Sequence, residues 1–214
     1  EFGGIITNLS REMELAQVRV RRGERVDRAR VAAEAPDVVI LATGAQPYQP
    51  EMPEDGSVQI LTAWQVLQGA KTGRRVLVAD WRADWIGPGI AEALIGQGCS
   101  VELALTAPAL GGQLPLYVRD DLAARLHGLG VKVTPYSRLY GVAGGTVYLQ
   151  HTASGAAIET DADTIVLCLG HRPEDGLRAD LADLPVEVVT IGDAMAARTA
   201  EEAVFEGLKA ACAI

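Results

Sequence analysis

The sequence predicts an α/β fold in which a parallel sheet carries an inserted antiparallel meander. Strand-like and helix-like segments alternate along the chain, as they do in parallel α/β proteins. The strand-like runs are short and almost entirely apolar, which is typical of strands covered on both faces. With 214 residues, of which 49% are apolar and 22% charged, the chain can form one large or two small globular domains.

Five segments carry the strand signal and three carry the helix signal. The predicted strands are residues 38–41, 76–78, 101–105, 165–167 and 188–191. Apolar residues recur at spacings of three and four in two predicted helices, giving each an apolar stripe: Ile6, Leu9, Met13 and Ala16 in the first, and Val118, Leu122, Leu126 and Leu129 in the second. A third helix opens at Thr199, because Glu202 follows three positions later as in a capping box. Its apolar stripe is Val204, Leu208 and Cys212.

One region breaks the alternation. Residues 131–169 contain several strand-like runs separated by Gly-Gly and Ser-Gly turns, which indicates the meander. Segments rich in Pro, Gly and acidic residues lie near 53–57 and 170–175, as linkers do. The pattern therefore predicts one nucleotide-type domain, residues 57–169, inserted into another formed by residues 1–56 and 170–214.

Composition excludes several classes of function. The formal net charge of −9 gives no general attraction for nucleic acid or an anionic membrane, and no apolar run is long enough to span a bilayer. The 3 cysteines are far apart without a CxxC pair, so they indicate reduced thiols of a soluble cytoplasmic protein. The 3 histidines are scattered and predict no metal site. The chain opens Glu-Phe-Gly-Gly and reads as a piece of a longer protein.

Three strand ends carry the signal for nucleotide binding. Small residues at the carboxyl end of a sheet let a ligand approach the backbone, and open α/β folds bind ligands there. A carboxylate just ahead of a helix can accept a hydrogen bond from a ribose or ribityl hydroxyl, while nearby amides can face phosphate. The candidate cofactor-binding residues at these ends are Ala42, Thr43, Gly44, Gly170, Gly192, Asp193 and Ala194.

The turn after residues 76–78 has the outline of a dinucleotide-binding turn but lacks its first glycines. Only Gly87 and Gly89 remain as candidates there, while Asp80 and Asp84 place negative charge where a phosphate would lie. These carboxylates serve either as caps for the amides of the following helix or in catalysis, and the first is favoured. Trp81 and Trp85 either stack on an adenine or a partner, or pack in the protein. We therefore expect no tight NAD(P) binding at this turn.

The chain resembles the flavoprotein disulfide-reductase fold in four segments taken in order. They are Ala-Thr-Gly, the turn after residues 76–78 that lacks its first glycines (the altered turn), Leu-Gly-His-Arg-Pro and Ile-Gly-Asp-Ala. The resemblance narrows to the C-terminal part of the trimethylamine dehydrogenase and 2,4-dienoyl-CoA reductase group of NADH:flavin oxidoreductases. It implies a Rossmann-like NAD(P)-type domain nested in a partial domain for FAD or ADP. It also implies a missing N-terminal barrel with FMN and a 4Fe-4S cluster. The first GxGxxG turn of that group is absent from residues 1–56.

The altered turn resembles the amine dehydrogenase branch, which passes electrons to an electron-transfer flavoprotein. A NADPH-dependent reductase of the dienoyl-CoA type and a non-catalytic nucleotide-domain scaffold remain alternatives. No catalytic residue is predicted within this chain, because no nucleophile–base pair or paired carboxylates are visible. An outer sheet without its first strands would expose an apolar edge, so self-association is expected.

Overall fold

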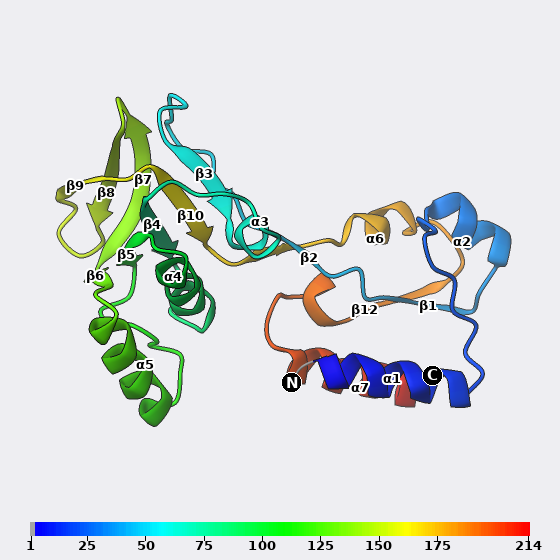
Figure 1. The fold of residues 1–214 in the computed structure, drawn as a ribbon. Helices are drawn as coiled ribbons and strands as arrows, with labels where there is room; N and C mark the ends of the chain where they lie inside the picture. The colour runs from blue at the N-terminus through cyan, green and yellow to red at the C-terminus, as the bar shows by residue number, and fades with distance from the viewer. Residues whose placement is uncertain (1–2) are drawn as a thin grey trace. The chain divides into compact units, whose positions relative to one another are not determined.

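The computed structural model describes residues 3–214, which divide into two compact units (Figure 1). One unit holds the described residues up to 40 together with 176–189, and the other holds residues 41–175 and 190–214. The predicted limits of the nested domains, near residues 57 and 170, stay a prediction. Within the described part of the chain, no helix has both the length and the apolarity that a membrane crossing needs.

A five-stranded sheet is the centre of the larger unit, and each of its four pairings is parallel. This confirms the predicted α/β class and three of the predicted strands. In sheet order the strands are β3 (Gln59–Thr62), β10 (Thr164–Cys168), β4 (Arg75–Asp80), β5 (Ser100–Leu105) and β6 (Lys132–Thr134).

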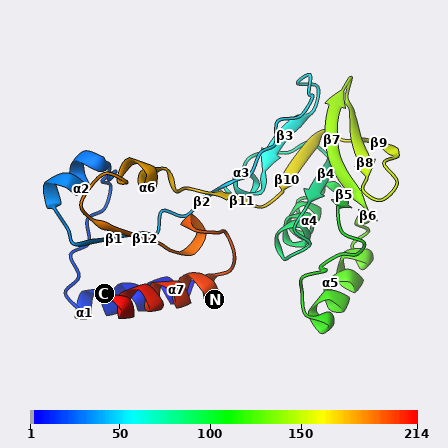
Figure 2. The same cartoon turned by 180° about the vertical axis from the view of Figure 1, so that it is seen from behind.

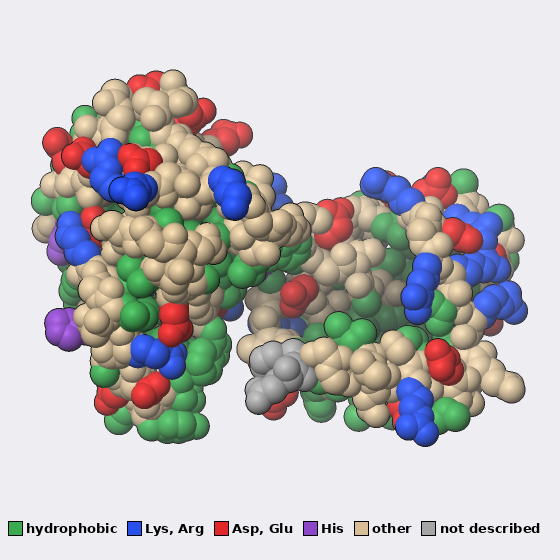
Figure 3. All heavy atoms as spheres, viewed as in Figure 1, with side chains coloured by type: hydrophobic (Ala, Val, Ile, Leu, Met, Phe, Trp, Pro, Cys, Tyr) green, Lys and Arg blue, Asp and Glu red, His purple; other side chains and the backbone are tan. Residues whose placement is uncertain are grey.

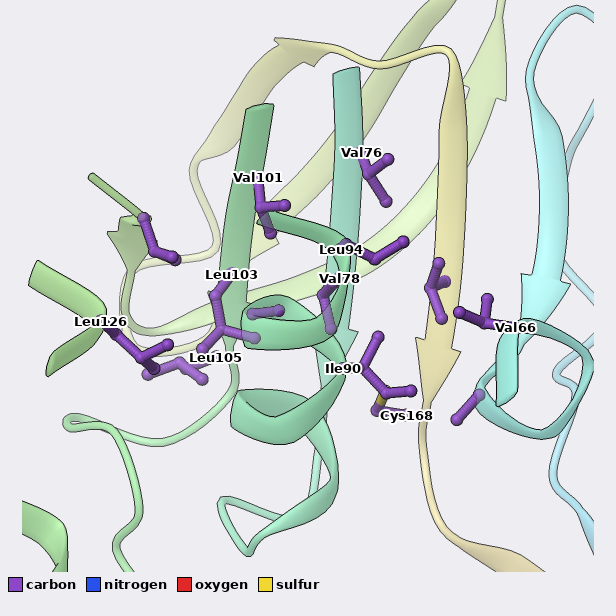
Figure 4. Packing of buried hydrophobic residues seen from close by; sticks show 14 of the residues in the cluster. Val66, Val76, Val78, Ile90, Leu94, Val101, Leu103, Leu105, Leu126 and Cys168 are labelled. Atoms are coloured by element: carbon purple, nitrogen blue, oxygen red, sulfur yellow. The ribbon is translucent and has the colours of Figure 1, made fainter. Parts of the chain in front are cut away.

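Helices cover one face of this sheet. They are α3 (Ala63–Leu67), α4 (Ile86–Gly96) and α5 (Leu116–Gly128). Figure 4 shows Val78 of β4 and Leu103 of β5 in the same apolar cluster as Leu94 of α4, and all three side chains are fully buried. The predicted stripe on α5 is confirmed in part, because Leu122 and Leu126 are buried.

The predicted meander covers the other face. Its strands β7 (Ser137–Ala143), β8 (Thr146–His151) and β9 (Ala157–Asp161) pair in an antiparallel sheet. Val147 and Leu149 of β8 join Leu77 of β4 and Ile165 of β10 in a second buried cluster. The larger unit thus has three layers, and its central strands are mostly apolar because both of their faces are covered.

The remaining elements include two short two-stranded sheets, which Figure 2 shows from behind. One sheet pairs β1 (Val38–Leu41) with β12 (Glu187–Thr190), and the other pairs β2 (Ala45–Pro47) antiparallel with β11 (His171–Pro173). The remaining helices are α1 (Gly3–Leu15), α2 (Arg28–Glu34), α6 (Gly176–Asp180), the 3-10 turn η1 (Gly192–Ala194) and α7 (Ala200–Ala213). The Thr199–Glu202 capping box is present at the start of α7, as predicted.

The predicted apolar stripes of α1 and α7 are largely exposed. No residue of α1 is buried, and Ile6 is 71% exposed. On α7, Leu208 is 65% exposed and Ala210 is the buried residue. Ile40 on β1 is also exposed. Amphipathic helices whose apolar faces remain in water mark surfaces that gain free energy when they are covered.

Basic side chains gather around α2 and the segment before it (Figure 3). Residues 18–26 carry many arginines but form no strand, contrary to what the alternation at Arg19-Val20-Arg21 indicates. Arg21 of this segment and Arg30 of α2 both pair with Glu34: their guanidinium nitrogens lie 2.7 Å and 3.3 Å from Glu34 Oε1. These pairs are exposed and contribute little stability each.

We predict that the 214-residue chain self-associates, because exposed apolar stripes and the edge of a two-stranded sheet favour partners. Size-exclusion chromatography with light scattering should give a mass above that of a monomer, rising with concentration. Replacing Ile6 and Leu9 by Gln should lower that mass, whereas Glu12→Gln on the same helix should not. A strictly monomeric wild-type chain would contradict the prediction.

Candidate functional site

The turn at the carboxyl end of β4 is organised by the side chain of Asp80. Asp80 Oδ1 accepts hydrogen bonds from the backbone amides of Arg82, at 2.8 Å, and Ala83, at 3.0 Å. Ala83 has a φ of 53°, in the left-handed region that side chains other than glycine rarely adopt. A carboxylate of the protein therefore binds the amides of this turn.

Asp80 is almost fully buried, with 1% of its surface exposed. Its second oxygen, Oδ2, is buried without a hydrogen-bond partner among the described residues. Burial raises the pKa of Asp80 from 3.8 to about 6, although the amides of Ala83 and Arg82 oppose this rise. The carboxyl group therefore changes charge much closer to neutral pH than an exposed aspartate does.

Gly87 accommodates the Asp80 carboxyl group. A Cβ at Gly87 would lie 2.6 Å from Asp80 Oδ2, which is too close for any side chain. At Gly89, by contrast, a Cβ would meet nothing within 4 Å, and its amide donates to Trp85 O at 3.0 Å in a helical bond. The close approach at Gly87 thus serves a side chain of this protein, and the amide of Gly89 is already engaged within the helix.

Asp84 lies two residues before the next helix, α4. Its Oδ1 accepts from the amide of Ile86, the first residue of α4, at 2.9 Å, and its Oδ2 accepts from Arg82 Nε at 2.8 Å. The capping prediction is confirmed for Asp84. For Asp80 it is wrong in detail, because that carboxylate binds the amides of the turn and not those of the helix. Together the two acids take amides that face a phosphate in a dinucleotide-binding turn.

Arg82 lies against the end of β10. Gly170, with a φ of +94°, would place a Cβ 3.2 Å from Arg82 Cδ. Trp81 also contacts the end of β10: its amide donates to Cys168 O at 3.3 Å, and its ring centroid lies 6.0 Å from that of Tyr48. Trp81 belongs to the apolar cluster beneath the meander, which agrees with packing, while Trp85 is exposed. The strand end that should receive a dinucleotide is thus filled by side chains.

The neighbouring strand end offers no group for a ribose. After Leu105, the amide of Thr106 donates to Asp80 O at 3.1 Å and its hydroxyl donates to Trp81 O at 3.4 Å. Neither an acidic residue for ribose hydroxyls nor an arginine for a 2′-phosphate follows β5. The residues present do not fit NAD(P).

The Ala42-Thr43-Gly44 segment forms a more open strand end. Thr43 Oγ1 donates to Glu174 O, and Gly44 O accepts from the Glu174 amide at 2.9 Å. Ala42 is exposed. Gly44 has a φ of +78°, and a Cβ there would meet nothing within 4 Å, so the backbone can be approached from outside.

The Gly192-Asp193-Ala194 turn is held by residues that sequence reasoning missed. Glu206 Oε2 accepts from the Gly192 amide at 2.7 Å, and Glu206 also pairs with Arg198. Asp193 Oδ1 accepts from the Arg198 amide at 3.2 Å, and Ala194 is buried. The position of Glu206 one helical turn beyond Glu202 is the only sequence signal for an acid that could reach back to this turn.

These two outer strand ends fit part of an FAD or ADP molecule. Asp193 Oδ2 receives no hydrogen bond from the described residues, so it can accept one from a ribose or ribityl hydroxyl. The open backbone at Gly44 allows close approach. A glycine-rich pyrophosphate turn is not among residues 3–56. The fit therefore covers the hydroxyl-binding side and not the pyrophosphate.

The histidines are not gathered into a metal site. His151 stacks with Tyr136 at 5.5 Å and His171 packs with Trp64 at 5.4 Å between ring centroids. Across residues 3–214, no group of three or more His, Cys, Asp or Glu side chains could hold a metal ion.

One family model and several curated proteins match this chain. The family model of the pyridine nucleotide-disulphide oxidoreductases matches residues 6–205. The chain is 32% identical over 190 residues to N,N-dimethylglycine/sarcosine dehydrogenase of Chromohalobacter salexigens, covering 80% of this chain and 27% of the relative. It is 29% identical over 210 residues to a probable N-methylproline demethylase of Rhizobium meliloti, covering 84% of this chain and 31% of the relative.

Solved structures with low sequence identity share the fold. Histamine dehydrogenase from Rhizobium sp. matches with a TM-score of 0.79 and 21% identity, over 88% of this chain and 32% of that one. A 2-naphthoyl-CoA reductase matches with a TM-score of 0.79 and 22% identity, over 94% and 30%. The chain thus spans about a third or less of the length of these proteins.

The raised pKa of Asp80 predicts a pH-dependent stability. A carboxyl whose pKa is about 6 when folded and 3.8 when unfolded destabilises the fold as it ionises, so stability is lost as pH rises from about 4 to 6. The loss is at most about 3 kcal/mol, because each tenfold change in an acid dissociation constant corresponds to ~1.4 kcal/mol. Asp80→Asn keeps the acceptor oxygen but carries no charge. It should therefore raise the free energy of unfolding at pH 8 and lose that advantage at pH 4.

Urea denaturation of both proteins at pH 4, 6 and 8 measures this difference. Asp175→Asn is the matched control, because Asp175 is exposed and its substitution should change little at any pH. An effect of Asp80→Asn that is the same at pH 4 and pH 8 would show that burial of charge is not its cause.

Proposed function

Because the chain belongs to the pyridine nucleotide-disulphide oxidoreductase family, we propose that it is the nucleotide-domain portion of an amine dehydrogenase-like flavin oxidoreductase. Membership of this family indicates a nucleotide-binding domain of a flavin-dependent oxidoreductase. In the proposal, the oxidation of the amine takes place on FMN in a barrel outside these 214 residues, beside a 4Fe-4S cluster. The proposed acceptor is an electron-transfer flavoprotein.

One observation carries the proposal: Asp80 and Asp84 bind the amides at the end of β4 and the start of α4. A nicotinamide dinucleotide needs those amides for its phosphates. Two carboxylates there also repel phosphate by roughly 1 to 4 kcal/mol at a few ångströms. A parallel-sheet domain in this condition keeps its architecture and does not exchange hydride with NAD(P).

Several similar proteins are named for amine substrates, which supports an amine as the substrate here. N,N-dimethylglycine, sarcosine, N-methylproline and histamine are all amines. Oxidising an amine on a flavin reduces the flavin, which must then pass its electrons to an acceptor. Because this chain does not bind NAD(P) in the proposal, the acceptor is another molecule. A protein acceptor fits that requirement.

In the outer site the residues of this chain would bind and orient a nucleotide. Asp193 would accept a hydrogen bond from a ribose or ribityl hydroxyl, while the backbone at Gly44 would lie against the ligand. A bound FAD would supply a redox-active flavin, whereas ADP would serve as a structural ligand. The candidate residues perform no proton transfer in this proposal.

A NADPH-dependent acyl-CoA reductase is the second candidate, favoured by the match to 2-naphthoyl-CoA reductase at a TM-score of 0.79. The two candidates differ in what the turn at Asp80 binds. A reductase of this kind requires NADPH there, and the amine dehydrogenase does not.

We predict that the whole polypeptide releases FMN together with FAD or ADP when it is denatured, as weighed by mass spectrometry. This follows from a flavin barrel joined to a nucleotide domain of the FAD or ADP type. Recovery of no nucleotide would favour a non-catalytic scaffold and would exclude both oxidoreductase candidates.

We further predict that NADH and NADPH bind the whole polypeptide more weakly than ~1 mM, equivalent to less than about 4 kcal/mol, in calorimetric titrations. Under anaerobic conditions, secondary or tertiary methylamines should bleach the flavin absorbance, and NADPH should leave it unchanged. Micromolar binding of NADPH with bleaching would favour the reductase and contradict the amine dehydrogenase.

A further inference from the structure

Glu206 is a mostly buried acid whose carboxylate contacts both ends of the loop from Gly192 to Arg198. Its side chain is 14% exposed. One oxygen, Oε2, accepts from the Gly192 amide at 2.7 Å, and the other, Oε1, pairs with the guanidinium of Arg198. A carboxylate removed from water to this extent is costly unless it is paired and hydrogen-bonded, and Glu206 meets both conditions.

Arg198 extends the contact across the rest of the loop. Its backbone amide donates to Asp193 Oδ1 at 3.2 Å, and its Nε donates to Ala196 O at 3.3 Å. Glu206 and Arg198 thus connect the two ends of the loop from Gly192 to Arg198. The position of the Asp193 carboxylate depends on both of them.

The start of α7 does not need Glu206. Thr199 and Glu202 form a complete capping box, which satisfies the first amides of the helix. Gly192 already lies close to α7, since a Cβ there would be 3.4 Å from that of Ala203. The two contacts of Glu206 therefore act on the loop and on Asp193, beyond what the helix itself requires.

We propose that Glu206, through Gly192 and Arg198, is a positioning residue that aims Asp193 Oδ2 at a hydroxyl of the bound nucleotide. The inference rests on the outer FAD or ADP site of the proposed function. With Oδ1 held by Arg198, Oδ2 is the oxygen left to the ligand, and its direction is fixed before binding. A fixed acceptor avoids the entropy of ordering a loop around the ligand.

The test uses the whole polypeptide freed of nucleotide and titrated by calorimetry with FAD and, separately, with ADP. Glu206→Ala removes both contacts and should weaken binding about tenfold or more, the effect of one charge-assisted hydrogen bond. Glu206→Gln keeps an acceptor for the Gly192 amide and should recover most of the affinity. Glu201→Gln, at an exposed acid of the same helix, should bind like the wild type.

Amide hydrogen exchange separates positioning from a general loss of structure. In Glu206→Ala the amides of residues 192–196 should exchange faster, while those in the middle of α7 should keep their protection. Weaker binding accompanied by faster exchange throughout α7 would instead assign Glu206 to helix packing and overturn the inference.

The titrations also separate this inference from the proposed function. If the wild type binds FAD or ADP and Glu206→Ala binds equally well, the positioning role is wrong and the outer site stands. If the wild type binds neither nucleotide, the outer site itself is wrong, and the role of Glu206 is overturned with it.

Discussion

The hydrogen bonds from the amides of Arg82 and Ala83 to Asp80 are the interaction on which the chemistry of the parallel-sheet domain depends. In this turn the carboxylate oxygen of Asp80 accepts the hydrogen bonds that a phosphate oxygen accepts in a dinucleotide-binding turn. Asp84 does the same for the first amide of α4. The amides of Arg82, Ala83 and Ile86 are therefore already hydrogen-bonded within the protein. The arrangement leaves Asp80 Oδ2 buried without a hydrogen-bond partner in the described part of the chain, which is unfavourable.

The three-layer arrangement explains why such a change can be tolerated. The central strands are covered by α3, α4 and α5 on one face and by the meander on the other, so the apolar clusters do not depend on the turn at their end. Glu102 of β5 adds a polar contact between two layers, because the hydroxyl of Thr160 on β9 of the meander donates to it. The hydroxyl of Thr134, on the neighbouring strand β6, donates to the other oxygen of Glu102. A sheet stabilised from both sides can keep its shape while the loops at its carboxyl edge change function.

Most of this architecture could be predicted from the sequence, because short apolar runs and periodic stripes are local signals. The parallel strands, the meander and the capping box at Thr199 followed from neighbouring residues alone. The contacts that shape the sites could not be predicted in this way. Arg82 against Gly170 and Glu206 with Gly192 join residues distant along the chain. The exposure of Ile6 and Leu208 was missed for a related reason: periodicity locates an apolar stripe but does not say whether the chain contains a surface to cover it.

The packing of Gly87 against Asp80 gives a second explanation for a glycine in a dinucleotide-binding turn. Glycines in such turns are usually explained by the approach of a cofactor, yet here a larger residue at this position would collide with a side chain of the same molecule. The packing of the turn alone is therefore enough to require a glycine at this position. A motif search that counts glycines therefore cannot separate a glycine that packs against a side chain from one that a cofactor approaches, unless it also inspects the last residue of the preceding strand.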